Sequence, residues 1–260
     1  MKKNLLFAAI MLFATTSIFA QSEQTVVIKE KGDGNERITV VEKIFHNEML
    51  YDALPNLYYS YLDMRTSAFG PEANVPLRSS SFEWGLYNST PVFITKGGHF
   101  GMSTGFGISN SYNFFTQDQV LRLDEERKAF FQSLNVYSSE EDHGPVNNFA
   151  HRSFLRYWSL RVPLMFQYQW KIQSTNTPMA IAAGAEFEWR FGVRSFARYG
   201  GAKHTITDNL DYNPIGFNAL VSLVFDDSVI FFRMGLTDMF TVKDSSDIYQ
   251  MAIGFGCKID

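Results

Sequence analysis

The sequence predicts an all-β protein built as an eight-stranded antiparallel transmembrane β-barrel. Several segments alternate apolar side chains with polar or very small ones, which is the period of a β-strand. In the clearest, 100–109, one face carries Phe100, Met102, Phe106 and Ile108, whereas the other carries only Gly and Ser. Such a small second face fits the interior of a narrow barrel, so the apolar face is expected to contact lipid. No segment after the N-terminus has the roughly 18 unbroken apolar residues of a transmembrane helix.

Composition agrees with this fold class. The chain has 260 residues, of which 45% are hydrophobic and 16% aromatic, with 25 Phe and 12 Tyr. Barrels use aromatic residues on the lipid face and in the girdles at both interfaces. The formal net charge of −4 argues against nucleic acid as a partner.

The N-terminus has the pattern of a secretory signal peptide, predicted over 1–20. A basic start at Lys2 and Lys3 precedes a short apolar run that ends in small residues at Ala20, before Gln21. The run is short for a membrane anchor, and no cysteine follows it to indicate lipoprotein processing. The mature chain is therefore expected to be exported after cleavage near Ala20/Gln21.

Residues 21–54 are expected to form a periplasmic hairpin and linker. The β-branched runs 25–29 and 37–41 flank Gly32-Asp33-Gly34-Asn35, and an Asp-Gly pair between two such runs predicts a hairpin. The linker, 46–54, has no assigned structure.

The barrel is expected to occupy 55–260. Its strands are predicted at 55–66, 80–94, 99–114, 153–171, 178–192, 214–226, 229–241 and 248–257. The first alternates poorly, but an even number of strands places both termini in the periplasm. A bulge is expected near Asn88–Pro91. In the fifth strand the even-numbered residues through Gly192 are expected to face inward.

The connections have the asymmetry of outer-membrane barrels. The links at 95–98, 172–177 and 226–228 are tight, whereas the long polar segments 115–152 and 193–212 fall on the opposite side. Both long segments are therefore predicted as extracellular loops, with a short helix near 121–133 as an option within the first.

Several motifs resemble those of small outer-membrane β-barrel proteins of the porin-like, PorT-like type. They are the N-terminal hairpin, Gly105-Phe106-Gly107 with Asn110 to Phe114, Leu160 to Met165, Gly184 to Arg194, and Gly254-Phe255-Gly256. The resemblance implies location and architecture more than activity, with outer-membrane lipid and the barrel-assembly machinery as partners. The chain departs from the family at its C-terminus, which ends Gly256 to Asp260 instead of on the aromatic residue that commonly serves as an assembly signal.

The inward face is expected to carry a polar network. Its members are Glu83, Arg161, Gln167, Gln169, Glu186, Glu188, Arg190, Arg233 and Gln250. Three acids balance three bases, and an eight-stranded barrel is only wide enough for side chains. An ion-pair network that plugs the lumen is therefore favoured over a gated proton or ion path.

No catalytic, cofactor-binding or metal site is predicted, and the protein is not expected to be an enzyme. Glu186 and Glu188 share one strand face, but the interleaved arginines make them salt-bridge partners more simply than acid–base catalysts. The alternative of a lipid A-modifying barrel depends on loop residues His151 and Ser153. Cys257 is expected to face lipid.

The favoured function is structural or interactive: a closed barrel that displays 115–152 and 193–212 for adhesion or for binding an extracellular or envelope protein. A narrow channel for small solutes is the second hypothesis. A lipid A-modifying enzyme and an envelope secretion or assembly factor are further alternatives.

Overall fold

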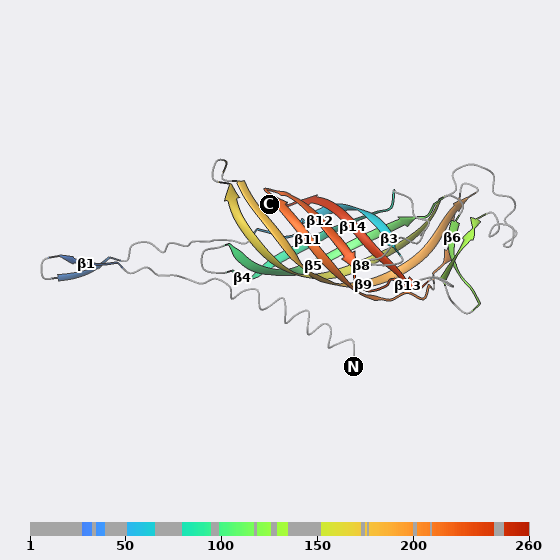
Figure 1. Cartoon of the computed structure of the whole chain (residues 1–260), viewed down its shortest axis with the longest axis horizontal. Helices are drawn as coiled ribbons and strands as arrows, with labels where there is room; N and C mark the ends of the chain where they lie inside the picture. The colour runs from blue at the N-terminus through green and yellow to red at the C-terminus, as the bar shows by residue number, and fades with distance from the viewer. Residues whose placement is uncertain are drawn as a thin grey trace, which may run out of the picture.

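The computed structural model is built almost entirely from antiparallel β-strands (Figure 1). It describes residues 28–32, 35–39, 51–65, 80–94, 99–116, 119–125, 129–134, 152–172, 175, 177–199, 202–208, 210–241 and 247–259. These residues include no helix long and apolar enough to cross a membrane.

Eight strands close into a ring, which confirms the predicted eight-stranded antiparallel barrel. In chain order they are β3 (Leu57–Arg65), β4 (Phe82–Ile94), β5 (Phe100–Phe114), β8 (Arg152–Ile172), β9 (Thr177–Tyr199), β11 (Ile215–Phe225), β12 (Ser228–Gly235) and β14 (Asp247–Cys257). Each pairs with the next, and β14 pairs with β3 to close the ring. The poorly alternating first strand is therefore a true barrel strand, held on both sides by β14 and β4.

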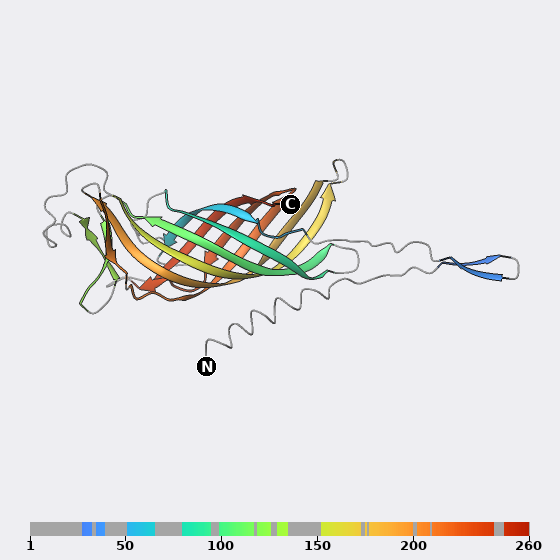
Figure 2. The ribbon, with the colours of Figure 1, turned by 180° about the vertical axis from the view of Figure 1, so that it is seen from behind.

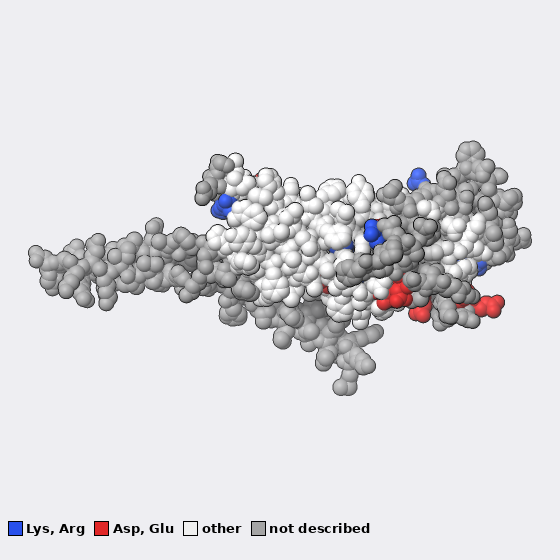
Figure 3. Space-filling view, in the orientation of Figure 1, with Lys and Arg blue, Asp and Glu red and all other residues white. Residues whose placement is uncertain are grey.

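The outer surface of the barrel is apolar. Successive residues alternate between buried and exposed on the regular part of each strand, and the exposed ones are large and hydrophobic. Examples are Trp84, Phe106, Leu164, Phe187, Leu223 and Phe255. The charged residues visible in Figure 3 gather mostly towards the two ends of the barrel. An apolar belt of this extent is stable in contact with lipid and would aggregate in water.

The two ends of the barrel differ. We call the end where β3 begins and β14 finishes the terminal end, and the other the hairpin end. At the hairpin end lies a two-stranded sheet of β6 (Gln119–Leu123) and β7 (Ala129–Ser133), visible beyond the ring in Figures 1 and 2. The short helix considered for 121–133 is therefore wrong. The segment instead pairs Leu121 with Phe131 and Leu123 with Ala129, which places these four apolar residues on one face.

The predicted loop 193–212 is also wrong in part. Strand β9 does not stop at residue 192 but continues to Tyr199, and β10 (Ala202–Thr207) pairs back on it. The extension is possible because β8 remains paired with β9 as far as Arg152 and Arg198.

A bulge at Gly192 changes which residues of β9 face inward. Gly192 has φ +63 and is exposed, so its expected inward position is wrong. Between the pairs Arg156–Arg194 and Trp158–Phe191, one residue of β8 lies opposite two of β9, Gly192 and Val193. A glycine adopts the required positive φ at little cost. Beyond it the odd-numbered residues face inward, beginning with Val193.

Two smaller features differ in position from those predicted from the sequence. The expected bulge in the second strand lies between Pro91 and Phe93, where proline cannot donate to the ladder. The predicted strand 229–241 is interrupted: β12 ends at Gly235, and after a turn the short β13 (Phe240–Thr241) pairs with β14.

The N-terminal hairpin is present as β1 (Ile28–Gly32) and β2 (Asn35–Thr39), a separate two-stranded antiparallel sheet. Its periplasmic location stays a prediction. The predicted signal peptide, 1–20, lies outside the described residues.

Candidate functional site

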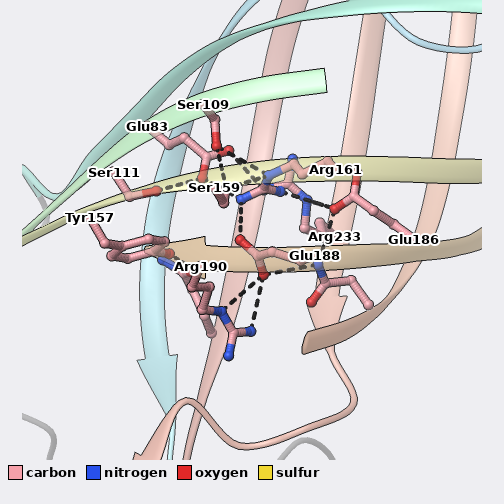
Figure 4. Close-up of polar contacts among 12 residues, drawn as sticks. Glu83, Ser109, Ser111, Tyr157, Ser159, Arg161, Glu186, Glu188, Arg190 and Arg233 are labelled. Atoms are coloured by element: carbon pink, nitrogen blue, oxygen red, sulfur yellow. Dashed lines mark hydrogen bonds and ion pairs between the residues drawn. The ribbon is translucent and has the colours of Figure 1, made fainter. Parts of the chain in front are cut away.

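A buried ion-pair network occupies the middle of the lumen, with Arg161 of β8 at its centre (Figure 4). Its Nη2 lies 2.6 Å from Glu83 Oε2 and 2.8 Å from Glu188 Oε1, and its Nη1 lies 3.0 Å from Glu186 Oε1. Its Nε donates to Ser109 Oγ at 3.1 Å and to Ser159 Oγ at 2.9 Å. One fully buried guanidinium therefore contacts three carboxylates from two other strands.

Two further arginines complete the charge balance. Arg233 Nη1 lies 2.8 Å from Glu83 Oε1, and Arg233 Nε lies 3.1 Å from Glu186 Oε1. Arg190 Nη2 lies 3.0 Å from Glu188 Oε2. Three acids thus face three bases in a site with almost no solvent exposure. This pairing is what compensates the cost of removing six charges from water.

Neutral donors add further hydrogen bonds to the carboxylates. The Tyr58 hydroxyl donates to Glu83 at 2.8 Å, and the Tyr87 hydroxyl donates to Glu186. Asn218 Nδ2 donates to Glu186 Oε1 at 3.0 Å. Sequence reasoning did not assign Tyr58 or Asn218 to the network. The signal for Asn218 was available, because it lies on the inward parity of the strand predicted at 214–226.

The structure places all nine residues of the expected network inside the barrel, but not in one cluster. The six charged residues lie together at mid-height. Gln250 lies towards the hairpin end, where it accepts a hydrogen bond from the Tyr157 hydroxyl. Gln167 and Gln169 lie towards the terminal end, where they bind the backbone of the segment before β3.

That segment, 51–56, enters the terminal end of the barrel and is called the plug segment below. Tyr51 N donates to Gln169 Oε1 at 2.9 Å, and its carbonyl accepts from Gln167 Nε2 at 2.8 Å. Ser222 Oγ donates to the Ala53 carbonyl at 2.6 Å. The part of the predicted linker that the structure describes is therefore folded into the lumen, which no pattern in residues 46–54 predicts.

An apolar layer, to which the plug segment contributes Ala53 and Leu54, lies on the terminal side of the ion pairs. Its buried residues are Ala53, Leu54, Tyr58, Tyr87, Met165, Ala182, Leu220 and Phe231. Phe231 fits because residue 254 is glycine: a Cβ there would lie 2.2 Å from Phe231 Cζ. Lumen glycines thus make room for aromatic rings from neighbouring strands.

A second apolar cluster fills the hairpin end. It includes Phe115, Leu121, Ala129, Leu155, Tyr157, Val193, Met239 and Phe240. The β6–β7 hairpin contributes Leu121 and Ala129, so this hairpin covers the lumen. Side chains therefore fill the barrel at three levels: plug segment, ion pairs and apolar cap.

The residues considered for a catalytic role have other partners in the structure. Glu186 and Glu188 both pair with Arg161. Ser153 is buried and donates to the Gln119 carbonyl, whereas His151 lies outside the described residues. Among the residues that the structure describes, no three His, Cys, Asp or Glu side chains are grouped as metal ligands.

Comparison with known proteins gives no family for this chain: no protein-family model and no curated protein matches it. One solved structure is similar, that of Ail, the attachment invasion locus protein of Yersinia pestis. The match has 11% sequence identity and a TM-score of 0.29, and it covers 77% of this chain and 93% of Ail. A likeness this distant does not bear on function, and the PorT-like resemblance stays a prediction.

Proposed function

We propose that this protein is an outer-membrane β-barrel of the structural or interaction type, which displays its hairpin end to an extracellular or envelope partner. The observation that carries this proposal is the filled lumen. Side chains occupy it at three levels, so the surface left to meet other molecules lies outside the barrel.

The outer-membrane location is supported by the apolar exterior of the closed barrel and by the predicted signal peptide. Lipid-exposed backbone requires every strand edge to be paired, and the closed ring of eight strands meets this requirement. Short links at the terminal end and long segments at the hairpin end favour a periplasmic terminal end.

The interaction role is supported by the size of the hairpin end. Strands β8 and β9 have 21 and 23 residues, whereas a transmembrane strand needs about 9–11. Their extensions pack with β6 and β10 through Val120, Leu134, Ala197 and Ile206. The two hairpins thus form one ordered body beyond the apolar belt, and such a body can present a fixed binding surface.

Adhesion assays test the display role. Cells that express the full chain are compared with cells in which 119–133 is replaced by a Gly-Ser linker of equal length. We expect the linker variant to lose adhesion to cell monolayers and self-aggregation. Surface exposure and the heat-dependent gel shift confirm that it is folded, and equal adhesion by the two would overturn the proposal.

A narrow channel is the second candidate. Its test is the conductance of residues 21–260 in a planar bilayer, after folding has been confirmed by the heat-dependent gel shift. A silent barrel is expected because charged and apolar side chains fill the lumen. Steady, reproducible conductance steps would make the protein a pore.

A further inference from the structure

A dense group of cations lies on the outward face of β8, β9 and β10 near the hairpin end. It consists of Arg152, Arg156, Arg194, Arg198 and Lys203, and we call it the basic patch. The strand register places Arg156 opposite Arg194, Arg152 opposite Arg198, and Arg198 opposite Lys203. The cations therefore form two rows across the sheet.

This arrangement is unfavourable without a counter-charge. Like charges directly opposite on neighbouring strands destabilise a sheet. Within the part of the chain that the structure describes, none of the five forms an ion pair with a carboxylate. Partial burial, and then the charges of Arg156, Arg198 and Arg194, lower the pKa of Lys203. Among the described residues, the patch thus has no carboxylate paired with it that would stabilise it.

Aromatic rings line the space between the two rows. Phe154 lies opposite Phe196. Lys203 Nζ is 3.7 Å from the ring centroid of Phe196 and 5.3 Å from that of Phe154. Arg156 lies over the rings of Tyr112 and Trp158, 5.5 Å and 5.8 Å from their centroids. The cations are therefore held against an apolar surface.

The patch follows directly on the lipid-facing belt. Along β8 the outward residues run from Val162 and Leu164 through Trp158 to Arg156 and Arg152. Tryptophan and tyrosine mark the membrane interface in barrels, so the cations just beyond them lie at the height of the lipid headgroups. The two rows are four residues apart on β8, or about 13 Å at the usual strand rise.

We propose that the basic patch binds a phosphate-bearing lipid headgroup of the outer leaflet, one that carries more than one anionic group. The inference rests on the outer-membrane placement proposed above. Charge complementarity selects an anion, and arginine is well suited to phosphate. The aromatic rings between the two rows of cations favour a lipid over free phosphate, because the acyl chains beside a lipid headgroup would cover these rings. An acidic protein would leave this apolar surface against the bilayer unused.

Nanodiscs of phosphatidylcholine provide the test. The folded chain is reconstituted with increasing diphosphorylated lipid A, and lipid retained by the protein is measured by native mass spectrometry. Arg194→Gln/Arg198→Gln is compared with Lys171→Gln/Lys258→Gln, which removes two cations near the terminal end. We expect about a tenfold weaker retention in the first variant and unchanged retention in the second.

Two further probes identify the ligand. Dephosphorylated lipid A should be retained no better by the natural chain than by the patch variant. Inorganic phosphate at the concentration of the lipid should not compete; competition at that level would make the site a free-phosphate site and overturn the lipid assignment.

The outcomes separate this inference from the proposed function. A chain that fails to insert into nanodiscs would overturn the membrane placement. Insertion with equal lipid A retention by both double variants would overturn only the basic patch as a lipid site, and the adhesion assay would be unaffected.

Discussion

Arg161 Nη2 and Glu83 Oε2 lie 2.6 Å apart at the centre of the barrel, although 78 residues separate them in the chain. Both side chains are fully buried. Arg161 also contacts Glu186 and Glu188, so its single positive charge is shared by three carboxylates. The stability of the lumen therefore depends strongly on this one side chain.

Replacing Arg161 with Met should destabilise the barrel by about 3–5 kcal/mol, because three carboxylates would share two arginines in a site with almost no solvent exposure. Urea titration of the folded chain in detergent, followed by tryptophan fluorescence, measures the change. Arg161→Met/Glu83→Gln should recover part of the loss, since it removes one acid with the base. A single variant as stable as the natural chain would contradict the network as a structural element.

Gly254 and Phe231 form a second dependent pair. A valine at position 254 would collide with the Phe231 ring, at a cost of about 1–3 kcal/mol. Gly254→Val should therefore lower the temperature at which the heat-dependent gel shift occurs. The double variant Gly254→Val/Phe231→Ala tests the cause. If the collision is responsible, the temperature of its gel shift should be higher than the temperature expected from adding the effects of the two single variants.

The plug segment should contribute to stability without being the only barrier to ions. Leu54 is buried in the apolar layer, and Leu54→Ala should cost about 2–5 kcal/mol. A chain that begins at residue 55 should be less stable but still electrically silent, because the ion pairs and the apolar cap remain. If the shortened chain conducted ions and the full chain did not, the plug segment would be the gate.

The basic patch should lower the melting temperature in zwitterionic detergent and raise it when an anionic lipid is bound. In zwitterionic detergent, Arg194→Gln should raise the melting temperature slightly, because it relieves repulsion from Arg156 on the neighbouring strand. With diphosphorylated lipid A present, the same variant should gain less stabilisation than the natural chain. Lys171→Gln serves as the control and should show neither effect. Equal shifts for Arg194→Gln and the control would argue against a strained patch.

The strand pattern accounts for most of the fold that could be predicted. Alternation along 153–171 correctly assigned Arg161 to the interior and Leu164 to the exterior, since successive side chains of a strand point to opposite faces. The pattern did not reveal where β9 changes parity. That change depends on the positive φ of Gly192, which the register with β8 imposes. It also did not reveal β6 and β7, whose apolar residues are buried against side chains of other strands.

The sequence by itself determined the eight strands of the ring, most of the faces that they present and the set of charges that enter the lumen. These are local properties, set by the period of the backbone and the order of side chains. The tertiary structure decided which charges meet, that the plug segment enters the barrel, and that five cations share one outward face. Those contacts join residues of different strands, so they depend on register, on the Gly192 bulge and on closure of the ring.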